Sequence, residues 1–122
     1  MKLAIVGSRT FCDYQMMVDY ISYITQAEHL AAITLIISGG ARGADDLAVH
    51  YAREHSIPYT LILPEWDRYG RSAGIIRNRL IIDSCDVCIA FWDQQSRGTE
   101  FDIRYCSQIG HPCYVCLFTP AQ

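Results

Sequence analysis

Hydrophobic residues follow two alternating patterns along this chain. Short runs of β-branched and other apolar residues, typical of strands, are separated by stretches in which apolar positions recur every three or four residues, typical of helices. Strands are expected at residues 3–6, 34–37, 59–63, 87–91 and 114–118. Because helical stretches separate successive strands, the pattern predicts βαβ units on a parallel sheet.

Four helices are expected between these strands. Asp13 can cap the first through its side-chain oxygen, and Gly110 and Pro112 can end the last. The stretch 65–71, rich in aromatic and charged residues, is expected to be irregular. The expected helices run from Asp13 to Ala31, from Ala44 to His55, and over 73–84 and 99–109.

The central strands indicate the architecture. Residues 35–37 and 87–91 are apolar at every position, as in parallel strands covered by helices on both faces. The sequence therefore predicts an α/β fold: a single Rossmann-like three-layer domain with a parallel five-stranded sheet, spanning residues 1–122. Sheets of this type bind ligands at the carboxyl ends of their strands, where the strand order reverses.

Three loops at that edge are rich in glycine and polar residues, namely 7–10, 38–45 and 92–99. Gly43 and Gly98 precede helices, where backbone N–H groups and the helix dipole favour anions. Hydroxyl groups and arginines in the loops suit phosphate. The residues expected to bind the ligand are Gly7, Ser8, Arg9, Ser38, Gly39, Gly40, Arg42, Gly43, Asp45, Trp66, Tyr69, Asn78, Asp93, Ser96, Gly98 and Thr99.

Two of these expectations have a structural alternative. Trp66 and Tyr69 can stack on a base or ribose, or they can simply seal the edge of the core. Neither the Walker pattern nor the complete G-x-G-x-x-G fingerprint is present in the loops, so a phosphate-transferring ATPase is not expected.

Composition and charge narrow the classes of function. The net charge of −3 disfavours a protein that holds nucleic acid by its backbone. No apolar run approaches the roughly 20 residues of a membrane span, and the apolar start is too short for a signal peptide. We therefore expect a cytoplasmic protein without a membrane partner.

Six cysteines include two C-x-x-C pairs, Cys85/Cys88 and Cys113/Cys116. That spacing can make a zinc site. However, these cysteines lie in or beside apolar strands, and strand residues three apart point to opposite faces. We favour buried core cysteines and expect no metal, with a zinc-structured interaction module as the alternative.

Several runs in this order resemble the YspA-like branch of the SLOG superfamily. They are Ile5–Arg9, Ser38–Asp45, Tyr69-Gly70, Ala73-Gly74, Arg77-Asn78, Ala90–Asp93 and Ser96–Thr99. The resemblance covers about residues 3–117 and implies a Rossmann-like fold that binds a nucleotide or an ADP-ribose-like ligand. The superfamily includes LONELY GUY phosphoribohydrolases and the DNA-processing protein A group, which binds single-stranded DNA. Many YspA-like members are thought to be ligand sensors in phage conflict.

The phosphoribohydrolase motif P-G-G-x-G-T-x-x-E is only partly matched. Gly98-Thr99 fits its G-T, Asp102 stands at its glutamate, and Arg77 is similar to its upstream arginine. The resemblance thus implies Arg77 with Asp102 or Glu100 as candidate catalytic residues. Because aspartate is one methylene shorter and catalytic geometry is strict, binding without reaction is favoured.

The leading hypothesis is therefore a sensor that binds a nucleoside monophosphate, ADP-ribose or a cyclic relative. It needs no cofactor, and a homo-oligomer is left open. The alternatives are N-glycosidic cleavage of a nucleotide and single-stranded DNA binding.

Overall fold

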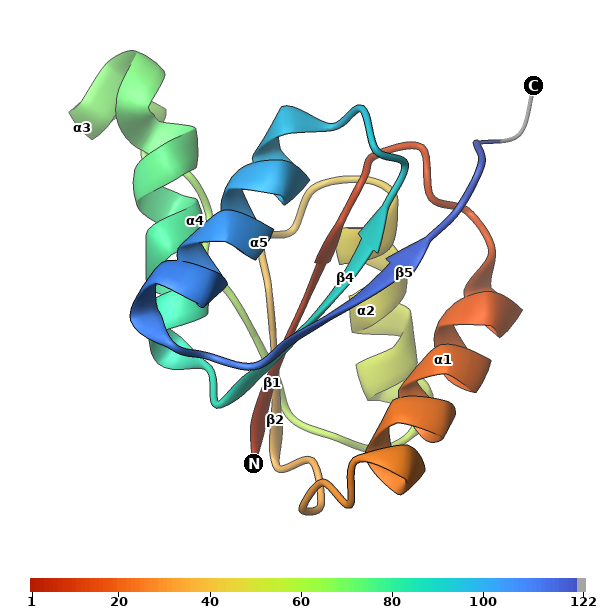
Figure 1. The fold of residues 1–122 in the computed structure, drawn as a ribbon. Helices are drawn as coiled ribbons and strands as arrows, with labels where there is room; N and C mark the ends of the chain where they lie inside the picture. Colours follow the sequence, from red (N-terminus) through yellow and green to blue (C-terminus); the bar gives the residue numbers. More distant parts are fainter. Residues whose placement is uncertain (121–122) are drawn as a thin grey trace.

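The computed structural model describes residues 1–120. Five strands alternate with helices along the chain (Figure 1). The elements are β1 (Lys2–Gly7), α1 (Tyr14–Ala27), β2 (Leu35–Ser38), α2 (Ala44–Glu54), β3 (Tyr59–Leu61), α3 (Trp66–Tyr69), a 3₁₀ turn (Gly70–Ser72), α4 (Ala73–Ser84), β4 (Val87–Trp92), α5 (Arg97–Ile109) and β5 (Cys113–Leu117).

All five strands are parallel and lie in the order β3-β2-β1-β4-β5. The chain builds one half of the sheet outward from β1, then crosses back to place β4 on the other side. The central pair is in register from Leu3 with Val87 to Gly7 with Phe91. The carboxyl ends of β1 and β4 therefore meet at the point where the strand order reverses.

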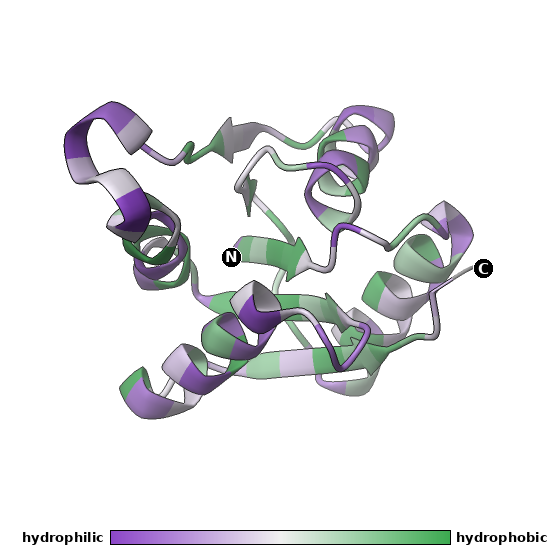
Figure 2. Cartoon of the chain, turned by 90° about the horizontal axis from the view of Figure 1, so that it is seen from above, coloured by the Kyte–Doolittle hydropathy of each residue, from purple (hydrophilic) through white to green (hydrophobic). Residues whose placement is uncertain are grey.

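Helices cover both faces of the sheet (Figure 1). On one face, α1 and α2 pack on alternate strand residues such as Ile5, Ile89 and Phe91. On the other, residues such as Val6 and Ala90 contact α4 and α5. Figure 2 shows predominantly hydrophobic central strands between helices that also carry hydrophilic surface. The predicted Rossmann-like α/β architecture with a five-stranded parallel sheet is confirmed.

Several predicted ends are off by one or two residues, such as that of β3, which ends at Leu61 rather than at residue 63. Two larger predictions are wrong. The first helix is capped as expected, since Asp13 accepts a hydrogen bond from the Met16 N–H at 3.0 Å. However, it ends at Ala27 rather than Ala31, because the chain turns at His29, whose φ is 52°. The stretch expected to be irregular contains the short helix α3 and the 3₁₀ turn.

Within residues 1–120, none of the helices is long and apolar enough to cross a membrane.

Candidate functional site

A cleft of about 420 Å³ opens where the carboxyl ends of β1 and β4 meet. Loops after β1, β2 and β4 contribute to it together with α4 and α5. Its lining includes these residues singled out from the sequence: Gly7, Arg9, Asp45, Arg77, Asn78, Asp93, Ser96, Gly98, Thr99 and Asp102. The structure thus brings together residues from both halves of the chain.

Arg77 reaches from α4 to the loop after β2. Its Nη1 donates to the Gly39 carbonyl at 2.9 Å, and its Nε donates to the Asn78 side chain at 2.8 Å. A Cβ at Gly39 would lie 2.6 Å from Arg77 Nη1 and 2.8 Å from Asp45 Oδ2. A side chain at position 39 would therefore displace the two charged groups that pack against this backbone.

Asp45 orders the loop between β2 and α2 from the first turn of α2. Its Oδ2 accepts a hydrogen bond from the Ala41 N–H at 3.2 Å, and its carbonyl accepts one from the Ser38 hydroxyl at 3.0 Å. Burial raises the pKa of Asp45 to about 6, against the opposing effects of the Ala41 hydrogen bond and the charges of Arg77 and Arg9.

Asp102 is the most perturbed carboxyl group in the cleft. It lies on α5, is 5% exposed, and its Oδ1 has no hydrogen-bond partner among residues 1–120. Burial raises its pKa to about 8, and the neighbouring Asp45 charge adds to this, while Arg77 opposes it. At neutral pH the group is therefore largely a protonated acid that can donate a hydrogen bond to a ligand.

Asp93 connects the loops after β1 and β4. Its Oδ1 accepts from the N–H groups of Gln95 and Ser96 at 2.9 and 2.8 Å, and its Oδ2 accepts from the Thr10 hydroxyl at 3.1 Å. Its own N–H donates to Ser8 Oγ at 3.2 Å. Desolvation is the largest single effect on Asp93 and raises its pKa, but the hydrogen bonds together outweigh it and hold the pKa below its ordinary value.

The two helix N-termini at this edge differ. The first N–H of α2, from Ala44, donates to the Ser8 carbonyl at 3.3 Å, so the β1 loop already occupies that end. At α5, Ser96 makes no capping hydrogen bond through its side chain, and Gly98 and Thr99 face the cleft. The α5 N-terminus is therefore the better placed for an anion.

The remaining candidates lie outside the cleft lining. Ser8, Ser38 and Gly39 are buried beneath it and hold the loops together. Trp66 is exposed on α3, and Tyr69 lines a separate cavity beside α4. The rest are Gly40, Arg42, Gly43 and Glu100, of which Glu100 forms an ion pair with Arg104 at 2.7 Å.

Two polar residues of the cleft were not among the predicted ligands, namely Thr10 and Gln95. Both belong to strand-end loops that the sequence analysis singled out, and their polar side chains in those loops were the available signal.

The two C-x-x-C pairs do not form the four-sulfur zinc site considered above. Cys113 packs in the core layer with α4 and α5, whereas Cys116 packs in the layer with α1 and α2. The expected opposite orientation of the two side chains is thus confirmed.

Comparison with known proteins decides the family. A model of the YspA, cpYpsA-related SLOG family matches residues 1–69. The Gene 61 protein of Mycobacterium phage D29 is 31% identical over 117 residues, covering 91% of this chain and 92% of that protein. The chain belongs to the YspA, cpYpsA-related SLOG family.

Two solved structures share the fold of this SLOG protein. DNA processing protein A from Helicobacter pylori, described for its single-stranded DNA binding mode, has a TM-score of 0.66 and 23% identity. DNA processing protein A from Streptococcus pneumoniae has a TM-score of 0.69 and 20% identity. They cover 94% and 93% of the SLOG chain, which spans only 64% and 49% of their lengths.

Proposed function

We propose that this SLOG protein is a sensor that binds a nucleotide-derived ligand, such as a nucleoside monophosphate, ADP-ribose or a cyclic relative, in the cleft between β1 and β4. The observation that carries the proposal is the buried Asp102 carboxyl, whose Oδ1 has no partner among the described residues and which lines the cleft with Arg77 and Asp45. Leaving such a group unsatisfied costs about 1–3 kcal/mol, which a ligand hydroxyl would recover.

The cleft contains both carboxyl groups and arginine side chains, which can bind the sugar and the phosphate of such a ligand. The Asp45 and Asp102 carboxyls lie at its buried side and can bond ribose hydroxyl groups. Arg9 is exposed and lines the same cleft, where its charge also acts on Asp45, and its guanidinium can hold a phosphate. A ligand with a sugar and a phosphate offers partners to both kinds of group.

The proposal stops at binding. N-glycosidic cleavage by the relatives' motif would use a carboxylate beside the sugar, but the pKa of Asp102 is raised to about 8. Glu100 is paired with Arg104 and lies outside the cleft lining. The geometry therefore supports holding a nucleotide better than hydrolysing it.

Replacing Arg77 with glutamine tests this proposal. In the unaltered protein, AMP or ADP-ribose is expected to raise Tm. Arg77→Gln is expected to weaken binding at least about tenfold, equivalent to about 1.4 kcal/mol, because a cleft cation is lost. Isothermal titration calorimetry measures the affinity, and chromatography of the same samples detects released base.

Arg79→Gln is the matched control, because Arg79 is exposed on the same helix and lies over the Phe101 ring at 5.7 Å rather than in the cleft. The proposal fails if no nucleotide in the panel binds, or if both variants bind as tightly as the original chain.

Single-stranded DNA binding is a second candidate, favoured by an aromatic and basic surface at α3. Trp66 is 56% exposed and Tyr69 is 36% exposed, and the Arg68 guanidinium lies 5.0 Å from the Tyr69 ring centroid. Exposed aromatic rings beside arginines are typical of surfaces on which bases stack. The structural likeness to DNA processing protein A adds to this candidate, while the net charge of −3 opposes it.

Trp66→Ala tests the DNA candidate. Loss of one stacking ring is expected to weaken binding of an oligothymidine by about 1–3 kcal/mol, and affinity should fall steeply with salt. Fluorescence anisotropy of a labelled oligonucleotide measures both. Tyr23→Ala serves as the control, since Tyr23 is 65% exposed on α1. Equal binding by the two variants would remove α3 as the contact surface.

A further inference from the structure

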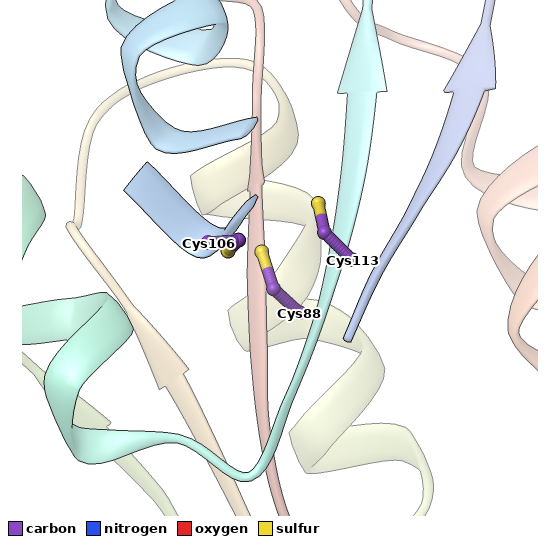
Figure 3. A group of neighbouring side chains, drawn as sticks. All are labelled: Cys88, Cys106 and Cys113. Carbon is purple, nitrogen blue, oxygen red and sulfur yellow. The ribbon is translucent and has the colours of Figure 1, made fainter. Parts of the chain in front are cut away.

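Three cysteines from three different elements meet on one face of the sheet (Figure 3). They are Cys88 on β4, Cys106 on α5 and Cys113 on β5, and their sulfur atoms all lie within 4.8 Å of one another. Cys88 and Cys113 are register partners on neighbouring strands, so both point toward the layer that contains α5. No two of these cysteines belong to the same C-x-x-C pair, so the cluster does not follow from that spacing.

The cluster lies almost entirely out of contact with solvent. Cys88 and Cys106 are 0% exposed, and only Cys113 is partly accessible. Hydrogen bonding with Cys106 and Cys113, together with desolvation, raises the pKa of Cys88. Cys113 is the most accessible of the three residues, so an incoming ion would reach the cluster from the side of β5.

The distances suit a single ion. Three sulfurs around one ion at about 2.3 Å are separated by at most roughly 4.0 Å, so the cluster needs to close by less than about 1 Å. Side-chain torsions can supply this without moving the strands.

We propose that Cys88, Cys106 and Cys113 form a three-thiolate site for a soft cation of the Cu(I) class. Thiolate ligands select Cu(I) and zinc among the physiological ions. Zinc in structural sites is almost always four-coordinate. The cluster offers three ligands among the described residues, and the fourth buried cysteine nearby, Cys85, donates its thiol to the Ile82 carbonyl at 3.2 Å instead.

An ion at this position would join α5 to β4 and β5. Cys106 lies one turn after Asp102 on α5, so the proposed site is directly behind the buried side of the cleft. Occupancy would hold the helix that carries both the Asp102 carboxyl and the anion-binding N-terminus.

Anaerobic titration of the reduced protein with Cu(I) tests the site. The ion is delivered from a chromophoric Cu(I) chelator, whose colour change reports transfer. The expected result is one ion per chain, with affinity reduced at least about 100-fold in Cys113→Ser and in Cys106→Ala. Cys116→Ser is the matched control on the same strand and is expected to bind as the original chain does, because Cys116 packs on the other face.

Circular dichroism confirms that each variant is folded, and Cys113→Ser is the milder change because Cys113 is only partly buried. Unchanged Cu(I) affinity in both Cys113→Ser and Cys106→Ala overturns the proposal. So does an equal loss in Cys116→Ser, or tighter binding of Zn²⁺ than of Cu(I) through the same three sulfurs. Mass spectrometry that finds a disulfide within the cluster of the anaerobically purified, unreduced chain also overturns it.

Discussion

Gly43→Ala is expected to destabilise the protein by at least about 4 kcal/mol, a large part of the stability of a small domain. Gly43 has a φ of 78° and a ψ of −129°, a conformation that L side chains rarely adopt. A Cβ there would also lie 2.6 Å from the backbone atoms of Arg9 and Ser8. Backbone atoms cannot move aside as a flexible side chain can, so the loops after β1 and β2 would have to separate.

Gly70→Ala isolates the steric part of this effect. Gly70 has nearly the same backbone conformation, with φ 58° and ψ −132°, but a Cβ there meets nothing within 4 Å. It should therefore cost only the backbone strain, about 1–3 kcal/mol. Urea denaturation of the two variants measures the difference in free energy of unfolding, and equal losses would show that no close approach exists at Gly43.

Asp102→Asn is expected to stabilise the protein at neutral and mildly alkaline pH by several kcal/mol, on the order of 3–5 near pH 8. The pKa of Asp102 is raised to about 8 in the folded chain, chiefly by burial. In the unfolded chain it is about 3.9. Between these values the folded state keeps a proton that the unfolded state loses, so the free energy of unfolding falls as pH rises.

The asparagine variant lacks this titration, so its advantage should grow from near zero around pH 4 to its maximum around pH 8. If the amide packs less well than the acid, the resulting cost lowers the free energy of unfolding of the variant equally at every pH and does not change its dependence on pH. Thermal unfolding across this pH range measures the slope, with Asp67→Asn on exposed α3 as the control. Parallel curves for the original chain and Asp102→Asn would show that the buried carboxyl does not titrate in this window.

The fold was predictable because local and tertiary signals agree. The continuous apolar runs at 35–37 and 87–91 became strands covered on both faces, as the pattern indicated. The end of α1 was not predictable, because Ala31 continues the helical period while His29 turns the chain in a conformation that its residue type does not reveal. Likewise α3 is too short for periodicity to indicate it.

The sequence indicated at which edge of the sheet the candidate site lies, but not which side chains line the cleft. Arg77, Asp45 and Asp102 all line the cleft at the edge where the strand order reverses, and they reach it from α4, α2 and α5. Sequence could not separate Ser38, which supports the loop from below, from Ser96, which faces the cleft. The cysteine cluster was hidden for a similar reason, because it is assembled by strand register and helix packing rather than by spacing along the chain.

The hydrogen bonds of Asp93 have a consequence for how quickly the cleft can be filled. They tie Thr10 and Ser8, from one half of the sheet, to Gln95 and Ser96, from the other. The conformational entropy of both rim loops is therefore lost when the chain folds, before any ligand arrives. A ligand of the proposed kind would meet a rim that is already ordered, so we expect diffusion and orientation, rather than loop closure, to limit the rate of association.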